Sequence, residues 1–229
     1  LLLASDYSQV ELRILASLSK DKGMITAFKN KEDIHSATAA KVFGVSLNDV
    51  DREMRSKAKA VNFGIAYGQG AFGLAQNLNI SRGEAKEIID SYFTKYSSVK
   101  GYMDSSIEEA RENGFCTTIM GRVLRLRDIN SANHMVRSQA ERIAINAPIQ
   151  GSAADIIKVA MINIHNWLQK TEYKTKMLLQ VHDELIFDVP KDEMDTIKPI
   201  VEKEMENAFK LAVPLVVDSG IGNNWLEAH

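Results

Sequence analysis

The chain has 229 residues and a mass of 25.5 kDa, enough to bury a hydrophobic core in one large domain or two small ones. A hydrophobic content of 45% with 25% charged residues is typical of a globular protein. The single cysteine, Cys116, excludes an internal disulfide and favours a reducing compartment. The sequence also lacks the run of roughly 18 apolar residues that a membrane span requires.

The net charge of −2 gives no sign of a polyanionic partner, so any such partner must meet a local concentration of charge. The segment 121–142 provides one, with five arginines against Asp128 and Glu141: Arg122, Arg125, Arg127, Arg137 and Arg142. Acidic residues gather instead between Asp183 and Glu206. This separation can produce a basic track on a nearly neutral protein.

The first half of the chain predicts one short strand followed by helices. The apolar residues 1–5 predict a buried strand that ends at Asp6, and the spacing after Val10 turns helical. Further helices are expected at 34–43, 51–67, 81–95 and 97–113, with breaks at Gly44, at 68–70 and at Gly114. Ser81 and Glu84 form a capping box for the third of these helices.

The second half predicts long helices and then strands. Residues 130–147 predict a helix that Pro148 interrupts or kinks, and a second helix continues to Leu168. The apolar runs 177–181 and 185–189 predict a β-hairpin with charged residues at its tip. A helix is expected after Pro190 and a last strand at 215–218.

Asp6 and Asp183 each follow an apolar strand, and antiparallel pairing of those strands would bring them together. Taken alone, Asp6 would most simply cap a helix, and Asp183 would most simply be an exposed residue at a hairpin tip. Together they offer the hard oxygen ligands that Mg²⁺ prefers, and Mg²⁺ commonly uses only one or two protein carboxylates. Two such ions roughly 3.5–4 Å apart activate a hydroxyl and stabilise a departing phosphate.

One expected helix carries cations at its start and aromatic rings at its end. Arg55, Lys59, Phe63 and Tyr67 recur every four residues and therefore share one face. A nucleoside triphosphate has the same polarity, with phosphates at one end and a base at the other. The plainer alternative is an amphipathic surface helix with ordinary cations and two core aromatics.

Three segments carry a family resemblance. DYSQVELR at 6–13, RSKAKAVNFGIAYG at 55–68 and QVHDEL at 180–185 resemble, in this order, motifs A, B and C of the bacterial DNA polymerase I family, family A. The resemblance runs through essentially the whole chain to the ending GIGNNWL at 220–226.

The resemblance implies an α+β fold in which a helix-rich fingers subdomain is inserted into a palm with a small antiparallel sheet. The palm is expected at residues 1–20 and 129–229, and the fingers at residues 21–128. The chain is then expected to be a fragment that lacks the thumb and any nuclease domains, with little activity alone.

The implied activity is template-directed transfer of deoxynucleotides to a primer 3′-hydroxyl with two Mg²⁺ ions. Asp6 and Asp183 would be the metal ligands, Glu184 would support them, and Lys59 could protonate the leaving pyrophosphate. The partners would be primer–template DNA and deoxynucleoside triphosphates, with no membrane. The protein is expected to be a monomer in the bacterial cytoplasm, associated with the nucleoid.

The resemblance also assigns binding roles. Nucleotide-binding residues would be Arg55, Lys59, Phe63, Tyr67, Gln9, His35 and Glu11. Glu11 would act as a steric gate that rejects a ribose 2′-hydroxyl. DNA-binding residues would be Arg142, Asn146, Gln150 and His182. Arg142, Asn146 and Gln150 recur every four residues, and donors on that face could grip minor-groove acceptors without reading sequence.

Some residues depart from the family pattern, and other functions stay open. GRVLRLR at 121–127 replaces an arginine-richer run, so only Arg122 is kept as a possible DNA contact. Another two-metal enzyme such as a nuclease, and a non-catalytic DNA-binding module, are alternatives. GQGAFG at 68–73 matches a dinucleotide-binding fingerprint. That fingerprint must follow a strand, whereas the preceding residues here have helical spacing, so the match is interpreted as accidental.

Overall fold

The computed structural model describes all residues, 1–229, and they form two compact units. The first, here called the sheet unit, comprises Leu1–Val10 and Ala153–His229. The second, the helical unit, comprises Glu11–Ser152. The predicted α+β class is confirmed, since one unit holds an antiparallel sheet and the other is mostly helical. No helix combines the length and apolarity needed to cross a membrane.

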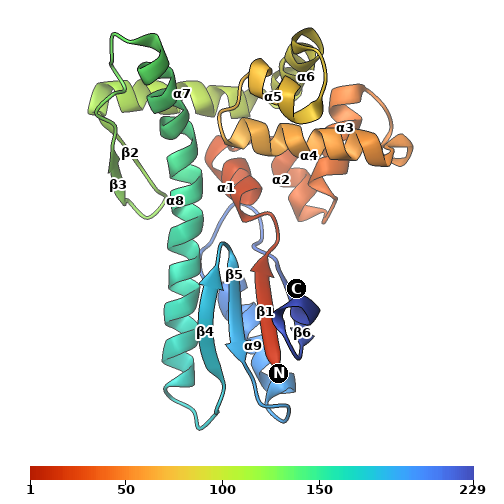
Figure 1. Cartoon of the computed structure of the whole chain (residues 1–229), viewed down its shortest axis with the longest axis vertical. Coiled ribbons are helices and arrows are strands. Elements are labelled where there is room, and N and C mark those ends of the chain that lie inside the picture. The colour runs from red at the N-terminus through yellow and green to blue at the C-terminus, as the bar shows by residue number, and fades with distance from the viewer. The chain divides into compact units, whose positions relative to one another are not determined.

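The sheet unit is built on four antiparallel strands in the order β4-β5-β1-β6 (Figure 1). Its elements are β1 Leu2–Tyr7, β4 Lys176–Val181, β5 Glu184–Asp188, α9 Met194–Glu206, β6 Val217–Gly222 and α10 Trp225–Ala228. The first strand of the chain, β1, therefore lies in the interior of the sheet, between β5 and β6. This pairing brings residues from both ends of the sequence to the same part of the sheet.

Apolar side chains fix the register of β1. Leu3 lies opposite Phe187 of β5, and both side chains are fully buried. Helix α9 contacts β1 and β6, and its buried residues Met194, Ile197, Val201 and Met205 recur at helical spacing. Leu3, Ala4 and Ser5 are buried in succession, so both faces of β1 are covered, as expected of a strand in the interior of a sheet.

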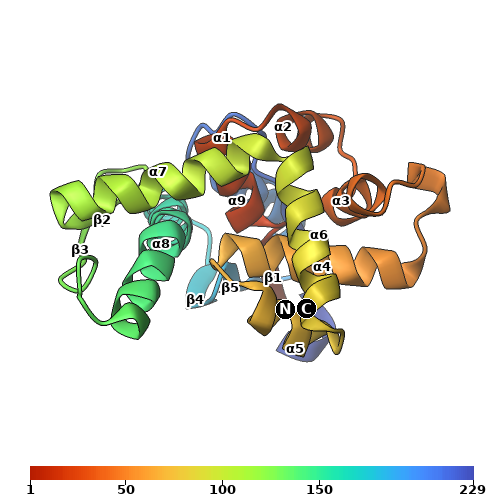
Figure 2. The same ribbon diagram turned by 90° about the horizontal axis from the view of Figure 1, so that it is seen from above.

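The helical unit is a succession of short helices followed by a small ribbon. Its elements are α1 Val10–Ser19, α2 Lys22–Lys29, α3 Ile34–Phe43, the 3₁₀ turn η1 Leu47–Asp49, α4 Arg52–Ala66, α5 Ala71–Leu78, α6 Arg82–Lys95, α7 Ser97–Asn113, β2 Phe115–Thr117 and β3 Val123–Arg125. Helix α3 packs on α4 and α6, and α7 leads from α6 to the β2–β3 ribbon (Figure 2).

The predicted helix boundaries in this unit are confirmed to within about one residue because local signals set them. Asp21, Asp33, Asp51 and Ser81 each cap a helix by accepting a hydrogen bond from a first-turn amide. Two helices end at a glycine in the left-handed region, α3 at Gly44 and α7 at Gly114.

Helix α8 runs without a break from His134 to Leu168, so the predicted interruption at Pro148 is wrong, while the alternative of a kink there stays a prediction. A proline inside a helix removes one backbone hydrogen bond and crowds the preceding turn. Pro148 is buried here among residues such as Ala144 and Ile149, and its carbonyl accepts a hydrogen bond from the Ser152 hydroxyl. Burial of this side of α8 offsets the cost of the missing bond, so the helix continues past the proline.

The hairpin prediction is confirmed and the last strand is displaced. Strands β4 and β5 are joined by the two residues His182 and Asp183. The last strand was expected at 215–218 but spans Val217–Gly222. The glycine run at 68–73 follows helix α4 rather than a strand, which removes the structural basis for a dinucleotide-binding fingerprint.

Candidate functional sites

The sheet unit brings three acidic residues together. Asp6 of β1 lies opposite Glu184 of β5 in the antiparallel register. Asp183 occupies the tight turn before β5, where its carbonyl accepts a hydrogen bond from the Tyr7 amide at 3.2 Å. His182 adopts φ of 55°, the left-handed conformation that lets the hairpin turn in two residues. We call Asp6, Asp183 and Glu184 the carboxylate site.

The charges of this site disfavour one another. Burial and the neighbouring charges of Asp183 and Glu184 together raise the pKa of Asp6 to about 6, although His229 acts in the opposite direction. A hydrogen bond between the Asp6 and Asp183 side chains also favours the protonated form. The Oδ1 atom of Asp6 is buried and has no hydrogen-bond partner. Ionisation of Asp6 is therefore unfavourable beside Asp183 unless a cation binds between them.

Glu184 is held differently from the two aspartates. Its side chain is buried, and both of its oxygens are engaged. Oε2 accepts a hydrogen bond from Trp225 Nε1 at 3.0 Å, and Oε1 lies 3.2 Å from His229 Nδ1. Both partners come from the C-terminal residues that include α10. Sequence reasoning missed Trp225 and His229, because nothing in their local pattern indicates a partner more than 40 residues away.

The carboxylate site suits a hard divalent cation. Its donors are carboxylate oxygens, and the orphaned Asp6 Oδ1 is the kind of buried atom that a cation would satisfy. The structure contains no group of three or more His, Cys, Asp and Glu side chains arranged to hold a metal.

The helical unit presents the predicted face of α4. Lys59 and Tyr67 are exposed, and Phe63 is partly buried beside Tyr67, with ring centroids 6.2 Å apart. The opposite side of the helix faces the interior through Ala58, Val61 and Ile65. The spacing thus places the cations and the rings on one accessible face, as predicted.

Arg55 does not point freely into solvent. Its Nε and Nη2 atoms donate to the two carboxylate oxygens of Asp33 at 3.2 and 2.7 Å. Asp33 also caps α3 by accepting from the Ser36 amide at 2.7 Å. Burial alone would raise the pKa of Asp33, but the hydrogen bonds from Arg55 and Ser36 and the Arg55 charge hold it at about 2. The predicted phosphate ligand is thus paired within the chain.

His35 lies beside this face in a buried position. Its ring centroid is 5.8 Å from that of Phe63, and its Nδ1 atom is 3.1 Å from Asn62 Nδ2. Burial and the charges of Arg55 and Lys59 together lower the pKa of His35 to about 4, although the charge of Asp33 opposes this shift. The ring is therefore neutral at physiological pH.

A cavity of about 340 Å³ opens at the aromatic end of α4. Its lining includes Phe63 and Tyr67 of α4 and Arg142 of α8. Gly68 allows α8 to approach, because a Cβ added there would lie 3.3 Å from Arg142 Cγ and the backbone φ is +65°. The structure thus brings Arg142 to the aromatic residues, which the sequence could not establish.

Comparison with known proteins decides the family. The family model for DNA polymerase family A matches residues 1–227. The chain belongs to DNA polymerase family A. It is 55% identical over 226 residues to DNA polymerase I of Caldicellulosiruptor bescii, covering 99% of this chain and 27% of the relative. DNA polymerase I of Pseudomonas aeruginosa is 50% identical, covering 100% of this chain and 25% of that protein. The chain thus spans about a quarter of the length of these relatives.

A solved structure has the same fold. It is the POL domain of Pol1 from M. smegmatis in complex with DNA primer-template and dNTP. It superposes with a TM-score of 0.95 at 46% identity, covering 99% of this chain and 40% of that one. The agreement extends to both compact units, since almost the whole chain is included.

The remaining predicted residues of this family A chain lie on two elements. Because α8 is continuous, Arg142, Asn146 and Gln150 follow one another along one side of the helix. Asn146 is partly buried, and its Oδ1 atom has no hydrogen-bond partner. Gln9 precedes α1 with a left-handed φ of 56°, and Glu11 lies in the first turn of α1.

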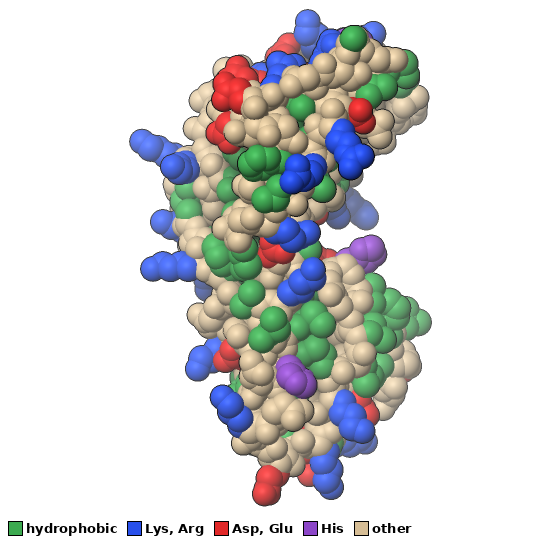
Figure 3. All heavy atoms as spheres, turned by 90° about the vertical axis from the view of Figure 1, so that its left-hand side faces the viewer, with side chains coloured by type: hydrophobic (Ala, Val, Ile, Leu, Met, Phe, Trp, Pro, Cys, Tyr) green, Lys and Arg blue, Asp and Glu red, His purple; other side chains and the backbone are tan.

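The family's arginine-rich run is replaced here by a structural ribbon. Arg122 Nη2 donates to the Gly151 carbonyl at 2.9 Å and so ties the β2–β3 ribbon to α8. Arg137 lies 3.8 Å from Glu141, which Arg111 also contacts. Figure 3 shows one face of the molecule with Lys and Arg side chains spread among exposed hydrophobic ones.

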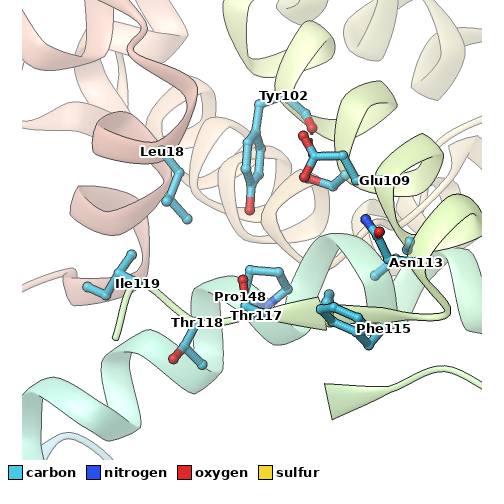
Figure 4. A pocket seen from close by; sticks show the side chains of 13 residues that line it. Leu18, Tyr102, Glu109, Asn113, Phe115, Thr117, Thr118, Ile119 and Pro148 are labelled. Carbon is cyan, nitrogen blue, oxygen red and sulfur yellow. Dashed lines mark hydrogen bonds between the residues drawn. The ribbon is translucent and has the colours of Figure 1, made fainter. Parts of the chain in front are cut away.

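A second cavity of about 260 Å³ lies in the helical unit, and none of its lining residues is a predicted site residue. Tyr102 and Glu109 of α7, Thr118 of the ribbon and Pro148 of α8 are among the residues that line it (Figure 4). Burial raises the pKa of Tyr102 to about 12, so its phenol remains protonated. No feature of this cavity indicates a ligand class.

Proposed function

We propose that this family A chain carries the palm and fingers of a template-directed DNA polymerase that joins deoxynucleotides to a primer 3′-hydroxyl. The observation that carries the proposal is the pairing of β1 with β5, which places Asp6 beside Asp183 with an unsatisfied buried oxygen. The proposed palm remains residues 1–20 and 129–229 and includes the whole sheet unit, and the proposed fingers, residues 21–128, lie within the helical unit.

Asp6 and Asp183 would hold two Mg²⁺ ions. When bound, these ions activate the primer hydroxyl and neutralise charge on the phosphates. The protein's contribution is to hold the two carboxylates at a fixed strand pairing, so that little reorganisation is needed when the cations arrive. Glu184 would act as a positioning residue, because its oxygens are already engaged by Trp225 and His229.

The face of α4 would receive the deoxynucleoside triphosphate. Lys59 is exposed and able to meet the phosphates as a point charge, and Arg55 could exchange Asp33 for a phosphate oxygen through its planar fork. Lys59 would also be placed to give a proton to the leaving pyrophosphate. Phe63 would pack on the sugar or base of the nucleotide, and Tyr67 would lie near the template base.

Other residues would select and grip the substrates. Glu11 would reject a ribose 2′-hydroxyl by steric conflict, and Gln9 and His35 would approach the triphosphate. The proposed DNA-contacting residues are Arg142, Asn146, Gln150 and His182. The position of Arg142 beside the aromatic end of α4 supports a contact near the nascent base pair.

The proposed setting follows from the relatives, which are bacterial DNA polymerase I proteins. We infer that the protein acts as a monomer on primer–template DNA in the bacterial cytoplasm, in association with the nucleoid. The complex of the M. smegmatis POL domain with DNA primer-template and dNTP supports these partners.

The proposal is tested with the full-length protein that contains the chain. Binding of Mn²⁺, followed by electron paramagnetic resonance, should fall sharply in Asp6→Asn and in Asp183→Asn. The rate of primer extension should fall sharply in the same variants. Lys59→Ala should weaken triphosphate binding, which a nuclease would not require. Undiminished extension by either aspartate variant would overturn the proposal.

A further inference from the structure

The buried surroundings of His35 contain a chain of polar side chains that the proposed function does not use. Asn62 of α4, Thr38 of α3 and Tyr96, which follows α6, are all fully buried, and His35 is 3% exposed. Buried polar groups are costly unless they are hydrogen-bonded, and a connected set fixes the orientation of each member. These four residues therefore form one ordered network.

The contacts of the network run in one direction. The Tyr96 hydroxyl lies 3.3 Å from Thr38 Oγ1, and Thr38 donates to Asn62 Oδ1 at 3.2 Å. The other end of the same amide, Nδ2, faces His35 Nδ1 at 3.1 Å. An amide nitrogen can only donate, so His35 Nδ1 must be the acceptor in this contact. The ring proton then belongs on Nε2.

The structure shows no hydrogen bond from the Nε2 atom within the chain, so the proton on this atom has no internal partner. The ring also lies within electrostatic reach of Arg55 and Lys59, the two cations of the α4 face. An anion with only acceptor oxygens would meet an N–H donor if the proton is on Nε2. It would meet a lone pair if the proton were on Nδ1.

We propose that Asn62 is a positioning residue for anion binding on α4, because its amide keeps the proton of the buried His35 on Nε2. This inference rests on the proposed function in taking the anion to be the triphosphate of a nucleotide. The network itself does not depend on that function. Asn62 would touch no ligand and would act only through His35.

Burial and charge explain why a neutral tautomer is used rather than a charged ring. Burial lowers the pKa of His35, Asp33 opposes the change, and the Arg55 and Lys59 cations add to it. A third positive charge beside these two would be disfavoured. A neutral N–H donor adds a hydrogen bond without adding that repulsion.

The first test reads the tautomer directly and needs no ligand. In protein labelled with ¹⁵N-histidine, the His35 signals are assigned by their loss in His35→Gln. Two-bond ¹H–¹⁵N correlations should place Nδ1 in the unprotonated range and Nε2 in the N–H range. In Asn62→Asp, whose carboxylate only accepts, Nδ1 should become protonated. A wild-type ring protonated on Nδ1, or spectra unchanged by Asn62→Asp, would overturn the proposal.

The second test asks whether Asn62 acts through His35. Asn62→Leu should raise the Kd for a deoxynucleoside triphosphate about 5- to 10-fold, the effect of losing one hydrogen bond to a charged group. Asn113→Leu, the same exchange at an exposed position of α7, should leave the Kd unchanged. In a His35→Ala background Asn62→Leu should have little further effect. Fully additive effects would show that Asn62 serves packing alone and would refute the proposal.

The two tests separate this inference from the proposed function. If the wild-type protein binds no triphosphate, the proposed function fails, while the tautomer measurement still decides the role of Asn62. If the triphosphate binds and the tautomer is on Nδ1, the proposed function stands and the inference fails.

Discussion

The carboxylate site and the α4 face differ in how they treat charge. In the sheet unit, Asp6 and Asp183 are forced together by strand pairing, and one buried oxygen remains unsatisfied. In the helical unit, Arg55 is neutralised by Asp33, while Lys59 stays exposed. The first site is thus destabilised until positive charge arrives, whereas the second is already stable and must exchange a partner to bind an anion.

The largest expected effect on activity comes from removing the negative charge of Asp6 or of Asp183. Asp6→Asn and Asp183→Asn should each lower the rate of primer extension by about 10²–10³-fold, since one cation ligand is lost. The same variants should not lower the melting temperature in a chelator, because a like-charge repulsion is relieved. Both quantities are measured with Asp188→Asn as control, an exposed carboxylate at the other end of β5. A melting temperature lowered only in the site variants would contradict the idea of repulsion.

The next effect concerns the neutral His35 of the α4 face. Its pKa is lowered from 6.5 to about 4, so below pH 6.5 the unfolded chain gains a proton that the folded chain does not. The free energy of unfolding should therefore be largest above pH 6.5. It should decline toward pH 4 by on the order of 2–3 kcal/mol from this residue.

Urea denaturation at several pH values measures this decline. His35→Gln should show a shallower dependence on pH than the wild type. His134→Gln, at an exposed position of α8, should retain the wild-type slope. Equal slopes in the wild type and His35→Gln would exclude a buried neutral histidine.

A smaller effect is expected where the sheet unit supports its third carboxylate. Trp225→Phe removes the donor to Glu184 Oε2 and leaves a buried charged oxygen with one partner fewer. The free energy of unfolding should fall by about 1–3 kcal/mol. Leu226→Ala, at a side chain 90% exposed in the same helix, should change it little. Similar losses in both variants would mean that α10 acts through packing alone.

The smallest effect tests whether Arg55 must leave its partner. Asp33→Asn retains a capping side chain for α3 but weakens the bidentate pair with Arg55. The Kd for a deoxynucleoside triphosphate should fall about two- to threefold, because an exposed ion pair contributes well under 1 kcal/mol. Glu53→Gln, which breaks the Lys57 pair on the same helix, is the matched control. A Kd raised by Asp33→Asn would show that Asp33 orients Arg55 rather than competes for it.

The sequence predicted those features that depend on neighbouring residues. The caps at Asp33 and Ser81 and the glycine ends at Gly44 and Gly114 are local, and the helices begin and end there. The approach of Asp6 to Asp183 followed from two apolar strands with acidic ends. Catalysis and ligand binding by the predicted site residues remain predictions.

What the sequence did not predict depends on packing between distant segments. The Arg55–Asp33 and Asn62–His35 contacts join residues 22 and 27 positions apart on different helices. Neither can be deduced without knowing how α3 lies on α4. Pro148 was misjudged for the same reason, because burial along α8 outweighs the local preference of proline to end a helix.

The central position of β1 has a consequence for the order of folding. Residues 2–7 pair with 184–188 on one side and with 217–222 on the other, so the sheet cannot close until the last strand has been synthesised. The helices from α2 to α7 pack mostly on elements closer in sequence than the partners of β1, and local contacts form faster than distant ones. We expect that, before residues 217–222 are synthesised, the helices of the nascent chain have formed while the β6-facing edge of β1 is still unpaired. Any polypeptide released before residue 217 would then lack the partner of one edge of β1.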